Sequence, residues 1–206
     1  MSVKLRHLVG ISAFAFLFTV SLAAAQEPQP VRVRGTIESV DGPMLSVKGR
    51  DGSALKVKLA DNVRLLTVNK MSVADVKPGA FVGITAMPLS DGTQKVVEVH
   101  IFPEAMRGTG EGHRPWDLMP NSTMTNANIE TSVASADGQQ LVLKYKDGEK
   151  KFIMPPNVEV VMFAPATMAD VKPGEKIFVV AGKKQADGTI EAPSMVVGHG
   201  GVNPPM

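Results

Sequence analysis

The octapeptide SVADVKPG at Ser72–Gly79 recurs with two changes as TMADVKPG at Thr167–Gly174. Shorter matches flank both copies in the same order, with slips of a single residue. These pairs are Asp41-Gly42 with Asp137-Gly138, Asp51-Gly52 with Asp147-Gly148, Asn62-Val63 with Asn157-Val158, and Asp91-Gly92 with Asp187-Gly188. The chain therefore contains two copies of one module, at residues 31–104 and 128–198. Each copy is long enough to close a small core of its own.

Apolar residues in the first copy recur with a period of two, which is typical of half-buried strands. The Asp-Gly pairs reverse the chain between these strands, since glycine readily adopts a positive φ. Ser72 is expected to cap a short helical turn, which Pro78-Gly79 ends. The expected strands cover residues 31–38, 45–48, 55–59, 80–87 and 93–102.

The second copy repeats this plan, with strands expected at residues 129–133, 141–145, 151–154, 177–181 and 190–197. Three strands, a short helical turn and two more strands suit a small OB-type barrel, and an open sandwich is the alternative. A closed barrel is favoured because it removes the unpaired sheet edges. The sequence thus predicts an all-β protein of two tandem five-stranded OB-like barrels, each with a short helical turn between strands three and four.

A family resemblance supports this fold. The segments Gly35–Gly42, Asp75–Gly79 and Val96–Ile101 resemble bacterial exported OB-like domains of unknown function. The resemblance covers both repeats, and it implies a fold but no chemistry. Some similar exported sequences are associated with metal transport, which keeps a metal-handling role open as an alternative.

Residues 1–25 have the pattern of a signal peptide, with a basic start, an apolar run over Leu8–Leu22 and small residues at Ala23–Ala25. We expect cleavage after Ala25, and an N-terminal membrane anchor is the alternative. The rest of the chain has no apolar stretch long enough to span a membrane. Export predicts a periplasmic or secreted protein.

Composition excludes several functions. The chain has no cysteine, which rules out disulfides, thiolate metal sites, cysteine nucleophiles and a lipid anchor on cysteine. Cleavage would remove Lys4 and Arg6 and no acid, so the basic and acidic residues of the mature chain balance. A neutral chain with few aromatic residues is not expected to bind nucleic acid. No nucleophile elbow, phosphate-binding loop or pair of catalytic acids is present, so we expect neither an enzyme nor a cofactor.

The linker between the repeats, residues 105–127, contains the sequence HRPWD. Its candidate ligand-binding residues are His113, Arg114, Trp116 and Asp117. Arg114 and Asp117 would fix polar groups while Trp116 stacks on a sugar or a cation. The other interpretation is that Trp116 docks the linker into the groove between the two barrels. Both interpretations are compatible with a long loop.

A second candidate is a basic face on the strands that OB barrels use for oligonucleotides or oligosaccharides. Its residues are Arg32, Arg34, Lys48, Arg50, Lys56 and Lys58. Such residues also serve to prevent pairing at sheet edges, and the acids of the same repeat nearly balance them.

Metal binding has weak support. His113 and His199 are the candidate ligands, together with methionines, and no spacing predicts a preformed site. His100 shares its strand face with Glu98 and is expected to face solvent. His199 belongs to residues 199–206, which we expect to be a flexible tail.

The sequence therefore predicts an exported, non-enzymatic binding or accessory protein with an unknown envelope ligand or partner. The alternatives are a metal-handling protein and a structural envelope protein.

Overall fold

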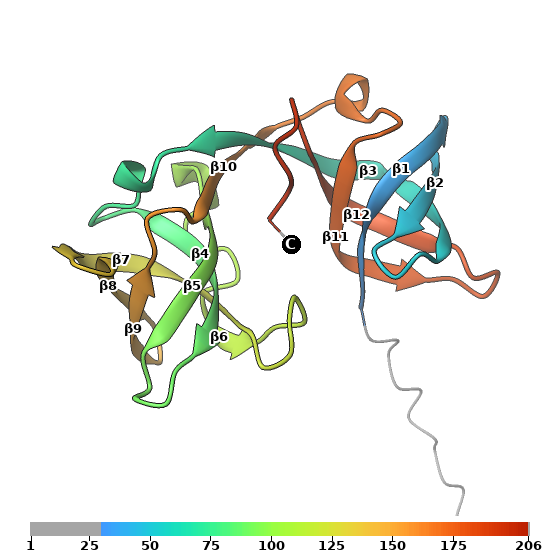
Figure 1. Cartoon of the computed structure of the whole chain (residues 1–206). Helices are drawn as coiled ribbons and strands as arrows, with labels where there is room; N and C mark the ends of the chain where they lie inside the picture. Colours follow the sequence, from blue (N-terminus) through green and yellow to red (C-terminus); the bar gives the residue numbers. More distant parts are fainter. Residues whose placement is uncertain (1–29, 206) are drawn as a thin grey trace, which may run out of the picture.

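The computed structural model describes residues 30–205, and the expected signal peptide lies outside them. The described residues form an all-β fold of two lobes (Figure 1). The strands are β1 (Val31–Asp41), β2 (Met44–Gly49), β3 (Ala54–Met71), β4 (Phe81–Pro88), β5 (Gln94–Ile101), β6 (Gly112–Pro115), β7 (Thr123–Ser135), β8 (Gly138–Tyr145), β9 (Gly148–Met154), β10 (Glu159–Pro165), β11 (Lys176–Lys184) and β12 (Ile190–Val197). Three short 3-10 turns connect them: η1 (Val73–Asp75), η2 (Glu104–Met106) and η3 (Met168–Asp170).

One lobe is a closed five-stranded β-barrel, which we call the first ring (right in Figure 1). Its strands pair in the order β12-β11-β1-β2-β3, and β12 runs parallel to β3 to close it. The first repeat supplies β1, β2 and β3, and the second repeat supplies β11 and β12. Its core therefore mixes side chains of both repeats, such as Ile37 and Leu45 with Ile177 and Val197.

The other lobe, which we call the second ring, uses the remaining strands of both repeats (left in Figure 1). They pair in the order β5-β4-β7-β8-β9, and a parallel pairing of β5 with β9 closes the ring. The first repeat supplies β4 and β5, and the second supplies β7, β8 and β9. Ile84 and Val99 accordingly share a core with Leu141 and Phe152.

This pairing corrects the expectation that each repeat closes its own barrel. The first three strands of each repeat combine with the last two strands of the other, so the repeats exchange strands within one chain. The physical reason lies in β3, whose 18 residues contain neither glycine nor proline. At about 3.3 Å per residue such a strand is about 60 Å long. It leaves the first ring and delivers the chain to the second instead of folding back.

Two strands connect the rings across the top of Figure 1. The end of β3 pairs antiparallel with β10, from Leu66 opposite Pro165 to Met71 opposite Val160. In the second repeat, Pro155-Pro156 separates β9 from β10. This end of β3 and the whole of β10 were not expected from the sequence.

The repeated octapeptide forms η1 and η3 with matching caps. Ser72 Oγ accepts a hydrogen bond from the Ala74 amide, and the Asp75 carboxylate accepts one from the Ser72 amide. Thr167 and Asp170 repeat this capping box. Neither turn buries its own residues. The valines that follow, Val76 and Val171, enter the two cores.

The linker and the tail are more ordered than expected. Within the linker, β6 pairs with the first residues of β7 as a hairpin. In the tail, His199 and Val202 form a β-bridge, and Pro204 and Pro205 are buried. The last described residues of the tail lie between the two lobes (Figure 1). Within residues 30–205, no helix is both long and apolar enough to cross a bilayer.

Candidate functional site

A cavity of about 310 Å³ lies between the two rings. The first ring contributes residues of β3, β11 and β12, and the second ring contributes residues of β5 and β7 with the neighbouring β6. Three further parts of the chain complete the wall: the segment between β5 and β6, the strand β10, and the C-terminal tail. The lining residues are Arg64, Leu66, His100, Phe102, Met106, Thr109, Gly110, Arg114, Trp116, Met124, Asn126, Phe163, Phe178, Val180, Ala181, Ser194, Met195, Val196 and Pro205.

Aromatic rings form much of one wall. The His100 imidazole meets Phe102 edge-on, with centroids 4.8 Å apart, and lies 5.0 Å from Phe163. Phe102 and Phe163 are themselves 5.5 Å apart. These contacts join β5 to β10, the strand that links the rings. A wall of this kind suits the apolar part of a ligand.

His100 does not face solvent as expected, because Phe102 and Phe163 pack against its ring on the outer face of β5. The side chain is only 6% exposed. Burial, and after it the nearby positive charge of Arg114, lower the pKa of His100 to about 3. The imidazole is therefore neutral at neutral pH. Its Nδ1 has no hydrogen-bond partner among the described residues.

Asn126 on β7 presents a second buried polar atom. Its Nδ2 donates to the carbonyl oxygen of Thr109 over 2.9 Å, which fixes the orientation of the amide. Its Oδ1 has no partner in residues 30–205. Both Asn126 and His100 lie against Gly83, where any Cβ would collide with the imidazole. Buried polar atoms without a partner cost about 1–3 kcal/mol each, so His100 and Asn126 are two unsatisfied polar side chains in an otherwise mostly apolar wall.

Trp116 packs against the outer surface of the first ring, as the docking interpretation requires. The indole is 8% exposed and meets Phe178 of β11 edge-on at 6.2 Å. The Arg32 guanidinium stacks on the indole at 4.1 Å from the ring centroid. Since Trp116 also lines the cavity, the same contact that joins the lobes forms part of the candidate site.

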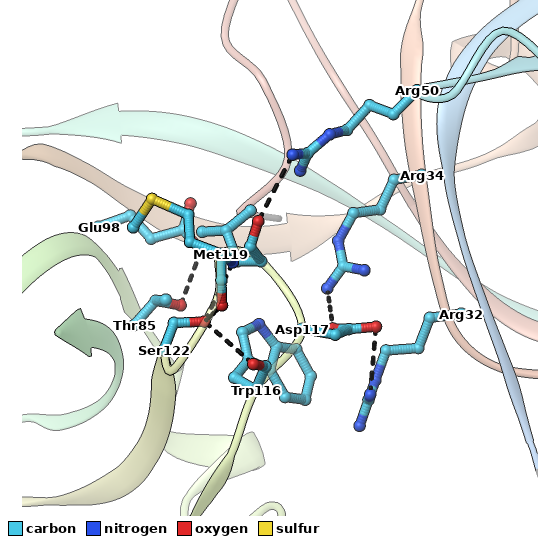
Figure 2. A network of polar contacts seen from close by, with 10 residues as sticks. Arg32, Arg34, Arg50, Thr85, Glu98, Trp116, Asp117, Met119 and Ser122 are labelled. Carbon is cyan, nitrogen blue, oxygen red and sulfur yellow. Dashed lines mark hydrogen bonds and ion pairs between the residues drawn. The ribbon is translucent and has the colours of Figure 1, made fainter.

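Asp117 ties the linker to β1 beside this contact (Figure 2). Its carboxylate accepts a hydrogen bond from Arg34 Nη2 at 2.7 Å and lies 3.4 Å from Arg32 Nη1. Partial burial acts to raise the pKa of Asp117, but the hydrogen bond and the charges of both arginines outweigh it and lower the pKa. Arg50 adds a long hydrogen bond of 3.5 Å to the carbonyl oxygen of Leu118. Arg32 and Arg34 thus hold a carboxylate of the chain itself.

The remaining candidates from the sequence lie elsewhere. Lys48, Lys56 and Lys58 stay exposed on β2 and β3, where Lys56 Nζ donates to Ser46 Oγ over 2.7 Å. They do not join Arg32 and Arg34 around Asp117, so the expected basic face is divided.

The two histidines weighed as metal ligands have different surroundings. His113 lies 2.7 Å from Thr125 Oγ1 through Nδ1 and stacks on Tyr145. Its pKa is lowered, mainly by burial and then by the charges of Lys150 and Arg114. His199 lies close enough to Asp170 to lower the pKa of that carboxyl, after the larger effects of its contacts with Thr167. Residues 30–205 contain no group of three or more side chains placed to hold a metal ion.

Sequence reasoning placed Arg114 and Trp116 in a candidate site, but it missed Asn126, Phe163 and Phe178. Asn126 was assigned to the linker although it lies in β7, and Phe163 belongs to the unexpected strand β10. The continuous apolar run from Val160 to Ala164 could have indicated that strand.

Comparisons with known proteins give no relative from which a role could be carried over. No protein-family model matches the chain, and no curated protein or solved structure matches it either.

Proposed function

We propose that this protein is an exported, non-enzymatic binding protein that holds a small molecule in the cavity between its two rings. One observation carries the proposal. The cavity has mostly apolar walls, yet it is lined by His100 and Asn126, each of which has a buried polar atom without a partner in the described part of the chain. An apolar pocket with a few convergent polar groups is typical of small-molecule sites.

We also propose that each ring is an OB-like barrel, so that the protein has two barrels built by strand exchange. In each ring, three consecutive strands are closed by two strands of the other repeat, and the last strand runs parallel to the third. This five-stranded Greek-key order supports the resemblance to OB-like domains. Short turns capped by Ser72 and Thr167 precede the fourth strand of each repeat.

Export rests on the signal-peptide pattern of residues 1–25. When the full-length protein is expressed in a Gram-negative host, it should appear in the periplasmic fraction. Its intact mass should equal that of a chain that begins at Gln26. A protein that keeps residues 1–25 would contradict this part of the proposal.

The cavity is tested with a neutral apolar fluorophore, N-phenyl-1-naphthylamine. Its emission rises when it leaves water, so titration of the native protein should give a saturable increase at one site per chain. Ala181→Phe places a ring in the cavity wall and should weaken binding at least about tenfold, whereas Ala181→Ser should bind like the native protein. No saturable binding, or equal binding by Ala181→Phe, would refute the proposal.

A further inference from the structure

We infer that the ligand of this cavity is an amphipathic anion: an apolar body of about a dozen heavy atoms that carries one carboxylate or a similar acidic head group. The inference deepens the proposed function, because it names the chemical class of the molecule that the cavity would hold.

The size of the ligand follows from the cavity. An apolar cavity of about 150 Å³ holds one benzene molecule, which has six heavy atoms. The cavity of about 310 Å³ is twice as large. Phe102, Phe163 and Phe178 supply aromatic contacts, and Met106 and Met195 supply flexible side chains that adapt to different shapes. A single alkyl chain or a fused pair of aromatic rings would fill this space.

The charge of the ligand follows from the lining. The described lining residues include Arg64 and Arg114 and no aspartate or glutamate. His100 adds no charge at neutral pH, because burial holds its imidazole in the neutral form. The cavity is therefore lined by two positive charges and no negative one, which favours a ligand with negative charge.

Arg114 is the residue best placed to hold the acidic head. It is half-buried, and its Nη1 donates to the carbonyl oxygen of Gly110 over 2.8 Å. The ion pairs found in residues 30–205 do not include Arg114. Burial lowers the pKa of Arg114, and the charge of Arg32 lowers it further. An anion beside Arg114 would relieve this repulsion and replace the lost hydration.

Asp117 does not neutralise this charge. It already binds Arg34 and Arg32, and it lies outside the lining of the cavity. The Arg32, Arg34 and Arg114 guanidinium groups lie 4.1, 5.7 and 5.8 Å from the centroid of the Trp116 ring. Asp117 thus binds two of the three cations around this indole, and Arg114 takes no part in those ion pairs.

The test compares probes with similar apolar bodies and different head groups. Decanoate and 2-naphthoate are the anionic probes, one aliphatic and one aromatic; decanol is the neutral probe and decyltrimethylammonium the cationic one. Calorimetry at concentrations below micelle formation measures each affinity, and Trp116 emission reports whether binding occurs at the cavity. We expect at least one of the two acids to bind at least about tenfold more tightly than decanol, and the cation to bind most weakly.

Three variants locate the head group. Arg114→Met should reduce the affinity for the preferred acid about tenfold and leave decanol nearly unchanged. Arg64→Met removes the other positive charge of the lining at an exposed residue. If Arg114→Met fails to fold, the affinities of Arg64→Met for the acid and for decanol provide the comparison instead. Lys48→Met removes an exposed charge outside the lining, and its affinities should equal those of the native protein.

The outcomes separate this inference from the proposed function. If N-phenyl-1-naphthylamine binds and decanol matches or exceeds both acids, the cavity is a binding site but the anionic class is wrong. A preference for the cation, or acid binding that persists in Ala181→Phe, also overturns the inference. If neither the fluorophore nor any of the four probes binds, the proposed function fails as well.

Discussion

Replacement of Trp116 by alanine should destabilise the whole protein, because this side chain joins the two rings. A buried tryptophan removes about 150–250 Å² from water, which is worth about 4–6 kcal/mol at about 25 cal/mol per Å². Loss of the Arg32 stacking adds about 0.5–2 kcal/mol. Water that enters from the adjoining cavity offsets part of this loss. We expect Trp116→Ala to lower the free energy of unfolding by about 3–5 kcal/mol.

Urea unfolding followed by far-ultraviolet circular dichroism measures this change, since the variant has no tryptophan to report on folding. Trp116→Phe keeps an aromatic ring against Phe178 and should lose less than half as much stability. The native protein should show blue-shifted emission before any ligand is added. Red-shifted emission, together with a Trp116→Ala protein that unfolds at the same urea concentration as the native protein, would show that Trp116 does not join the rings.

Three further predictions concern the strand exchange and His100. A chain of residues 30–104 lacks β11 and β7, which pair with β1 and β4, so it should give no folded monomer by light scattering and circular dichroism; a folded monomer would contradict the exchange. Gly83→Ala should lower the thermal midpoint by several degrees, since its Cβ would collide with the His100 imidazole, whereas Gly92→Ala, at an open turn, should leave the contacts of His100 unchanged. The pKa of His100 is about 3 instead of 6.5, so the unfolded chain takes up a proton there first and stability should fall as the pH drops from 6.5 toward 3. Nuclear magnetic resonance of the imidazole should show no protonation of His100 above pH 5, and a midpoint near 6.5 would refute its burial.

The repeats, the all-β class and most strands follow from the sequence, but the exchange of strands does not. Both repeats carry nearly the same pattern, so a strand of one repeat fits beside the partner strands of either copy. Alternation of side chains indicates which face is buried and not which copy buries it. The relevant signal was the absence of glycine and proline between Ala54 and Met71, in contrast to Pro155-Pro156 at the corresponding place in the second repeat.

The candidate site was harder to predict because packing between the rings creates it. His100 shares a strand face with Glu98 like any residue on an outer face, and only the packing of Phe102 and Phe163 against that face buries it. Phe178 similarly lies on the outside of the first ring, beside Arg34 in the neighbouring strand, and Trp116 covers it. Local patterns describe one strand at a time, so they give no sign of a wall that two rings share.

The strand exchange has a consequence for binding. In two barrels joined by an open linker, the lobes could separate and the cavity between them would be lost. Here β3 is part of the first ring at Val57 and pairs with β10 at Met71, and β10 pairs in turn with β5 of the second ring. Separation of the lobes would therefore break strand pairing as well as side-chain contacts. Under the proposed function, a cavity held in this way is formed before the ligand arrives, so little binding free energy is spent on ordering the walls.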